Sequence, residues 1–213
     1  MPKVNGKRRY DASGRRERAQ QTRLSILRAA QNLFEDRGYR PTTVTAVAQC
    51  GGVAPESVYK IFGTKAGLAK AVFDYTIAGD DDPVPVIERS ETKAIFAEPD
   101  VRKKITMYAD QMAARQVRSA RIQLMLRDGR HGQEDLEEIW RRLVDERLNG
   151  MTMLGRHLLD TGQLRPGIEL DEVRDVLWTY IAVDLYELLV LSRGWTVERY
   201  AQWIARAIIA ALT

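Results

Sequence analysis

The sequence predicts an all-α protein. Apolar residues recur at helical spacing through most of the chain, glycine and proline fall between the apolar segments, and no stretch alternates apolar and polar residues as a half-buried strand does. We expect a basic disordered arm at 1–16, a small domain of short helices at 17–64, a connecting helix at 65–79 and a larger helical domain at 80–213.

Charge is divided unevenly over the 213 residues. Residues 1–70 hold 14 Lys and Arg against 5 Asp and Glu, a net charge of +9, whereas the remainder has a net charge of −5. This predicts a polyanionic partner for the first third alone. Cys50 is the single cysteine, so no intrachain disulfide is expected, and no apolar run is long enough for a membrane span. We expect a soluble cytoplasmic protein that does not bind membranes.

The first 16 residues are basic and nearly free of apolar side chains, so they should be disordered on their own. They are either a solvated tail or an arm that contacts phosphates or a minor groove through Arg8, Arg9, Arg15 and Arg16. A helix should follow from Glu17 to Arg37, with a buried stripe of Ile26, Leu27, Ala30, Leu33 and Phe34, and Gly38 should end it.

The stretch from Thr43 to Lys65 predicts two short helices around a tight turn. Val44, Val47 and Ala48 give the first an apolar face, Gly51 and Gly52 end it, and Pro55 suits the first turn of the second. Val58, Ile61 and Phe62 are the apolar face expected for that second helix. This spacing fits a DNA-binding helix-turn-helix and equally an ordinary helical hairpin in an all-α core.

The identities of the residues in this stretch are more specific than the spacing of its apolar positions. The pattern T-V-x-x-V-A-x-x-G-G-V-A-x-x-x-V-Y-x-x-F-x-T-K-x-x-L, residues 43–68, resembles the DNA-binding signature of TetR-family transcriptional regulators, and 18–39 resembles the preceding helix and turn. There are two departures. Ala54 replaces the usual Ser or Thr cap, and Ile61 stands where His or Tyr is common, which removes a phosphate contact.

The resemblance implies a ligand-responsive repressor. Such a protein binds a palindromic double-stranded DNA operator as a homodimer, is released by a small-molecule effector and needs no cofactor. An activator or nucleoid-type binder with the same fold is an alternative. The residues expected to face DNA are Thr43, Glu56, Ser57, Tyr59, Lys60 and Lys65. Glu56 and Lys60 suit base edges, whereas Tyr59 and Lys65 suit phosphates, Lys65 because it begins a helix.

Beyond the linker at 79–83 the pattern remains helical. We expect helices at about 85–96, 101–117, 122–126, 134–161, 171–192 and 197–212. The last two have more apolar surface than a monomer can readily hide, which predicts a dimeric four-helix bundle through Leu188, Tyr200, Ile204 and Ile208.

An effector cavity is expected in this second domain. Its candidate lining residues are Tyr108, Met112, Met125, Trp140, Trp178 and Asp184. The aromatic and Met side chains could equally be plain core. Asp184, on a nearly apolar helix, could instead make a structural hydrogen bond or a contact in the dimer seam.

Signals for catalysis are weak. His131 and His157 have no metal or triad spacing, and the acidic linker at 80–82 lacks the further ligands of a metal site. No enzyme activity and no metal are expected. The rival hypothesis is a small helical enzyme or adaptor with a basic N-terminus.

Overall fold

The computed structural model describes residues 12–82 and 84–213, and every regular element in them is helical. The all-α prediction is confirmed. The first half contains α1 (Ala12–Arg37), α2 (Val44–Gly51), α3 (Pro55–Phe62), α4 (Lys65–Ala78), η1 (Val86–Glu88) and α5 (Ser90–Ala97). The second half contains α6 (Val101–Gly129), α7 (Glu134–Asp160), α8 (Leu170–Tyr180), α9 (Val183–Tyr186), the π-helical turn η2 (Glu187–Ser192) and α10 (Val197–Leu212).

The short N-terminal helices begin and end where local signals predict. Thr43 caps α2 by accepting a hydrogen bond from the Ala46 amide at 3.1 Å, and Thr64 caps α4 by accepting one from Gly67 at 2.9 Å. Gly52 ends α2 with a φ of 67°, in the left-handed region that favours glycine. Ala54 precedes α3 and makes no side-chain cap, because alanine has no hydrogen-bonding side chain.

Two predicted boundaries are wrong. The first helix begins at Ala12, so 12–16 belong to α1 rather than to an arm. The helices expected at 101–117 and 122–126 are one continuous helix, α6, because no glycine or proline interrupts residues 118–121.

The helix expected over 171–192 is broken at Ile181 and Ala182. Gln116 of α6 donates a hydrogen bond from Nε2 to the Ile181 carbonyl oxygen at 3.2 Å, and Ala182 has a ψ of 135°. A carbonyl bonded to another element no longer needs an amide of its own helix, so the chain can turn here into α9 and η2.

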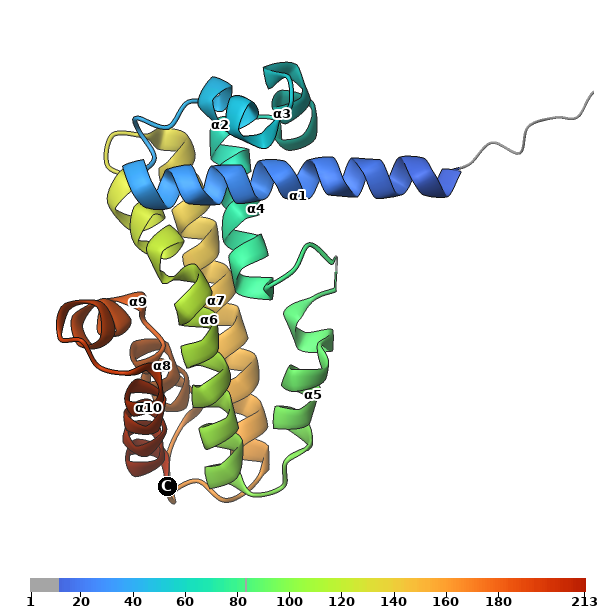
Figure 1. The fold of residues 1–213 in the computed structure, drawn as a ribbon. Helices are drawn as coiled ribbons and strands as arrows, with labels where there is room; N and C mark the ends of the chain where they lie inside the picture. Colours follow the sequence, from blue (N-terminus) through green and yellow to red (C-terminus); the bar gives the residue numbers. More distant parts are fainter. Residues whose placement is uncertain (1–11, 83) are drawn as a thin grey trace, which may run out of the picture.

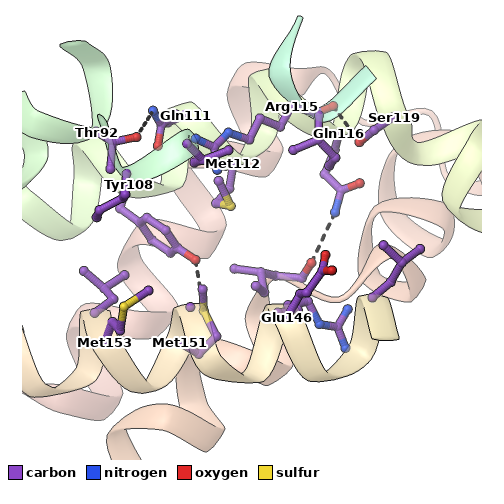
Figure 2. Close-up of a pocket in the computed structure, with 18 of the residues that line it drawn as sticks. Thr92, Tyr108, Gln111, Met112, Arg115, Gln116, Ser119, Glu146, Met151 and Met153 are labelled. Carbon is purple, nitrogen blue, oxygen red and sulfur yellow. Dashed lines mark hydrogen bonds between the residues drawn. The ribbon is translucent and has the colours of Figure 1, made fainter. Parts of the chain in front are cut away.

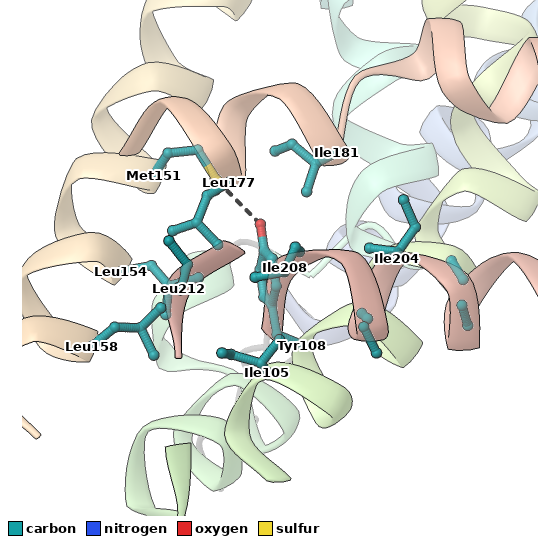
Figure 3. Packing of buried hydrophobic residues seen from close by; sticks show 14 of the residues in the cluster. Ile105, Tyr108, Met151, Leu154, Leu158, Leu177, Ile181, Ile204, Ile208 and Leu212 are labelled. Carbon is teal, nitrogen blue, oxygen red and sulfur yellow. Dashed lines mark hydrogen bonds between the residues drawn. The ribbon is translucent and has the colours of Figure 1, made fainter. Parts of the chain in front are cut away.

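Two apolar cores hold the molecule together. One joins α1 to α4 and also includes Ile122 and Leu126 of α6 and Leu136 and Leu143 of α7. The other lies among α5, α6, α7, α8 and α10, where α10 packs along α6 and α8 along α7 (Figures 1 and 3). The first core crosses the predicted domain boundary, so the small domain is packed onto the ends of the two longest helices.

Ion pairs join the elements on either side of the acidic linker. Asp80 accepts two hydrogen bonds from the Arg89 guanidinium, at 2.7 and 2.8 Å, and Asp81 accepts from Arg23 Nε of α1 at 2.9 Å. The Arg89 guanidinium holds the pKa of Asp80 down at about 2. The linker carboxylates therefore connect α4 to α1 and to the segment before α5.

Candidate functional site

The second helix of the helix-turn-helix, α3, presents a polar, exposed face. Glu56 and Lys60 are exposed and Tyr59 is 53% exposed, whereas Val58 packs into the core at 1%. Ser57 is partly exposed. These four polar side chains lie on the two free sides of a short helix whose third side is buried, as groove entry requires.

Ile61 is an exception to the predicted apolar face. It is 37% exposed, whereas Phe62 packs partly against the core. The prediction that Ile61 faces inward is therefore wrong, because the helix has room for Val58 and Phe62 only, four positions apart, on its buried side.

Lys65 lies at the N-terminus of α4 with its ammonium turned toward the α1–α2 loop. Its Nζ is 3.2 Å from the Arg40 carbonyl oxygen and 4.1 Å from the centroid of the Tyr39 ring. Partial burial lowers the pKa of Lys65. An ammonium group has three donors, so these contacts leave hydrogen-bonding capacity for a phosphate.

The predicted basic arm is only partly within the described residues. Arg8 and Arg9 lie outside them. Arg15 and Arg16 are exposed on the first turns of α1, in the half of the helix that extends away from the rest of the molecule (Figure 1).

A cavity of about 450 Å³ lies in the second domain, mainly between α6 and α7 (Figure 2). Its walls are mostly apolar, the usual character of small-molecule sites, and its volume is in the usual range. The side chains from α4 are Phe73 and Ile77. The remaining apolar walls are Pro85, Val86, Ile87, Ile95, Phe96, Tyr108, Met112, Trp140, Leu143, Val144, Met151, Met153, Leu154 and Ile181.

Three of the six predicted ligand residues line this cavity: Tyr108, Met112 and Trp140. The Tyr108 hydroxyl donates to Met151 Sδ at 3.1 Å across the space between the two helices, and burial raises the pKa of this tyrosine (Figure 2). Met125 is instead partly buried against the core of the N-terminal domain.

The other two predicted residues are outside the cavity, and their assignment is wrong. Asp184 is exposed and accepts a hydrogen bond from Arg127 Nη1 of α6 at 2.7 Å, so it makes the structural contact that was the alternative. Trp178 contributes indirectly, because its ring stacks under the Arg147 guanidinium at 3.6 Å and Arg147 itself lines the cavity.

The polar part of the cavity was not predicted from the sequence. Arg115, Gln116, Ser119 and Gln123 of α6 and Arg147 of α7 all line it. A signal was present, because residues 115, 116, 119 and 123 recur at helical spacing on one side of α6. On a long helix rich in arginine, such a stripe is not distinguishable from a solvated face.

The predicted dimer residues are mostly internal. Tyr200, Ile204 and Ile208 are buried in the core of the subunit, Ile204 at 2% exposure, because this side of α10 packs along α6 (Figure 3). Their assignment to the interface is corrected. Leu188 of η2 is 57% exposed.

Neither a metal centre nor a membrane span is found in residues 12–82 and 84–213. Within these ranges, no three His, Cys, Asp or Glu side chains are grouped to hold a metal ion. In the same part of the chain, no helix has the length and apolar character needed to cross a membrane.

Comparison with known proteins agrees with this arrangement. The family model described as bacterial regulatory proteins, tetR family, matches residues 26–72, which run from α1 into α4. The HTH-type transcriptional regulator TtgR of Pseudomonas putida is 28% identical over 172 residues, which are 79% of this chain and 80% of that protein.

Two solved structures share the fold over nearly the whole chain. FadR from Bacillus subtilis, in complex with stearoyl-CoA, has a TM-score of 0.71 at 16% identity and covers 89% of this chain and 99% of its own. NalD, the secondary repressor of the MexAB-OprM multidrug efflux pump in Pseudomonas aeruginosa, has a TM-score of 0.67 at 20% identity, with coverages of 92% and 98%. Together with the exposed helix α3 and the signature at 43–68, these matches show that residues 26–72 have the N-terminal domain of the tetR family and that the chain as a whole is similar to TetR-family transcriptional regulators.

Proposed function

We propose that this regulator is a repressor that leaves its operator when a small molecule enters the cavity. The observation that carries this proposal is the placement of α4. Its first residue follows the recognition helix after two intervening positions, and Phe73 and Ile77 in its second half line the cavity. A change in the cavity walls can therefore reach the DNA-binding domain through one short helix.

The relatives support both parts of the proposal. NalD is a repressor, and FadR was solved with stearoyl-CoA, so one protein of this fold represses transcription and another binds a ligand with a long apolar chain. A regulator that acts on bacterial DNA works in the cytoplasm, which is the location that we assign to it.

On DNA, we assign α3 to the major groove. Glu56 suits a cytosine amino group and Lys60 a guanine edge, whereas Tyr59 and Lys65 suit phosphates. Thr43 caps α2, and the first backbone amides of that helix can donate hydrogen bonds to a DNA phosphate. Arg15 and Arg16 extend the positive surface along α1.

Binding a palindrome requires a two-fold dimer, for which we propose the outer faces of α8 and α10. Partly exposed apolar side chains lie there, and the Tyr180 and Trp203 rings meet edge-to-face at 5.8 Å between the two helices. Leu188 and Leu191 of the neighbouring η2 are exposed large apolar residues. The proposed interface therefore uses the same two helices as the sequence prediction, but it uses the side of α10 opposite to Tyr200, Ile204 and Ile208.

In this proposal the effector changes the relative populations of two conformations of the dimer. It binds more tightly to the dimer conformation in which the two α3 helices no longer match successive major grooves, about 34 Å apart. Only its preference between the two conformations, and not its total affinity, releases the DNA.

The test begins with selection of duplexes from a random pool, followed by footprinting. We expect a two-fold symmetric footprint, a binding constant that falls steeply with salt, and loss of the complex with cavity-binding molecules. Transcription from the selected site, with and without the protein, separates repressor from activator. A protein that binds no duplex at low salt would favour the adaptor or enzyme hypothesis.

A further inference from the structure

Two arginine side chains line the cavity without a hydrogen-bond or ion-pair partner. Arg115 of α6 and Arg147 of α7 are both partly buried, and among the described residues neither guanidinium donates a hydrogen bond or lies within 4 Å of a carboxylate. The Nε of Arg147 is completely buried and unsatisfied. The Arg147 guanidinium stacks on the Trp178 ring at 3.6 Å, but neither guanidinium has a partner of opposite charge, which buried guanidinium groups normally have.

The neutral polar groups of the cavity have their own partners. Gln111 donates to Thr92 Oγ1 at 3.3 Å (Figure 2). Gln123 donates to Gln116 Oε1 at 2.9 Å and to Ser119 Oγ at 2.8 Å. What remains unsatisfied is therefore cationic.

The surrounding charges do not neutralise the pair. Burial lowers the pKa of Arg115, with further lowering by Arg118 and Arg89, and burial also lowers the pKa of Arg147. Glu91 acts on Arg115 and Asp184 on Arg147 only from a distance, because Asp184 is bonded to Arg127.

Among the lining residues that the structure describes, Glu146 is the one carboxylate. Its side chain is 61% exposed and its Oε2 lies 3.8 Å from Lys70 Nζ of α4. It therefore interacts with solvent and with a lysine at the rim rather than with either arginine.

We infer that the effector is an amphipathic anion, with an apolar body against the cavity walls and a carboxylate or similar planar oxyanion held by Arg115 and Arg147. This inference rests on the proposed function, because it names the chemical class of the proposed effector. Arg115 lies two turns after Tyr108 on α6 and Arg147 one turn before Met151 on α7. Because the Tyr108–Met151 hydrogen bond holds the two helices side by side, the anionic group belongs at this level of the cavity.

The physical reason is the cost of buried charge. An unpaired buried guanidinium is unfavourable, and a ligand oxyanion can accept two parallel hydrogen bonds from its planar fork. A small inorganic anion would leave the apolar walls unfilled, so the apolar body and the charge are both required for tight binding.

The test uses three probes with the same alkyl chain: dodecanoic acid, dodecan-1-ol and dodecylamine. Calorimetry on the full-length protein without DNA should show at least about tenfold tighter binding of the acid than of the alcohol, and the amine should be the weakest. Equal affinity for acid and alcohol, or no binding of the acid, would overturn the inference. Preferred binding of the amine would also overturn it and would assign Glu146 to the ligand.

Matched variants locate the anionic group. Arg115→Gln and Arg147→Gln should each lose the preference for the acid while keeping affinity for the alcohol. Arg121→Gln on α6 and Arg141→Gln on α7 remove the same charge from exposed positions and should leave the preference unchanged. An equal loss of the preference for the acid in all four variants would mean a general electrostatic effect and would contradict an anion site at Arg115 and Arg147.

Stability gives a second, independent measurement. Since Arg115 is a partly buried cation without a partner, Arg115→Met should melt at the same temperature as the wild type or higher in the absence of ligand. A clear drop in melting temperature would show that Arg115 is structural and overturn its role. These measurements need no DNA. The inference about the anionic effector can therefore be overturned while operator binding is observed, and it can hold while operator binding is not observed.

Discussion

At the residue scale, a few positions carry constraints that their neighbours do not. Gly67 is one of them, because a Cβ built there would lie 2.3 Å from the Phe62 carbonyl oxygen. A backbone oxygen, unlike the end of a flexible side chain, cannot move aside to make room for the added Cβ. The start of α4 therefore packs on the end of the recognition helix only if position 67 is glycine.

Gly67→Ala should destabilise the DNA-binding domain by about 1–3 kcal/mol, the usual cost of overpacking. The matched control is Gly150→Ala in α7, where a Cβ meets nothing within 4 Å and alanine should stabilise the helix by up to about 1 kcal/mol. Chemical denaturation measures both. A neutral Gly67→Ala variant would contradict the close packing of α3 on α4.

Lys65 and Glu56 separate affinity from sequence readout. Lys65→Ala should weaken binding to operator and random duplex alike and reduce the salt slope by about 1, because a lysine at a helix start contacts phosphate.

Glu56→Ala should relax preference at one base pair per half-site at a cost of about 1–3 kcal/mol. Selection from random duplexes checks both, and an unchanged Glu56→Ala profile would remove that residue from the readout.

At the scale of elements, α10 has one side in the core and one outside. Ile204 faces α6, whereas Ala207 is partly exposed on the outer side with Trp203. The two sides predict opposite results for the same new charge.

Ala207→Glu should leave the subunit folded and split the dimer, because the charge would be buried in the seam without a partner. Ile204→Glu should unfold the subunit, and Gln202→Glu, at an exposed position, should do neither. Light scattering and melting curves distinguish the three. A dimeric Ala207→Glu protein would rule out this side of α10 as the seam.

The Asp80–Arg89 pair joins α4 to the segment before α5 and gives a pH-dependent test. The pKa of Asp80 is lowered in the folded protein from 3.8 to about 2, so its stabilisation is complete above pH 3.8 and is lost as the pH falls toward 2. Asp80→Asn should lower the melting temperature at neutral pH, and its difference from the wild type should shrink across that window. Asp82→Asn, whose carboxylate makes no hydrogen bond among the described residues, is the control.

At the scale of the whole molecule, the proposed function depends on positive charge in one part of the chain and on an apolar cavity in another. Residues 1–70 have a net charge of +9 and the rest −5, a division that favours binding of the DNA polyanion by the first third of the chain. The cavity lies beside α4, close to the boundary between the two parts.

Removal of residues 1–11 tests the basic arm. These residues hold Lys3, Lys7, Arg8 and Arg9. If the arm binds phosphates, the slope of log binding constant against log salt should fall by about 0.9 for each phosphate that the shortened protein no longer neutralises. Affinity should fall for all duplexes, and the folded domain should melt as before. An unchanged slope would mean that these residues are a solvated tail.

The sequence alone determined the helix-turn-helix, because its signals act over a few residues. Two threonine caps, a glycine turn and a proline in a first helical turn place α2, α3 and α4 independently of anything distant. The family signature lies in the same stretch, and so do the exposed residues of the recognition helix.

Only the tertiary structure decided the character of the second domain. The break at Ile181 depends on a hydrogen bond from Gln116, 65 positions away. The placement of Asp184 outside the cavity depends on Arg127, 57 positions away, and the buried side of α10 depends on α6. Helical periodicity shows which residues share a side of a helix, but it does not show what that side contacts. Arg115 and Arg147 therefore become a candidate anion site only when α6 and α7 pack together.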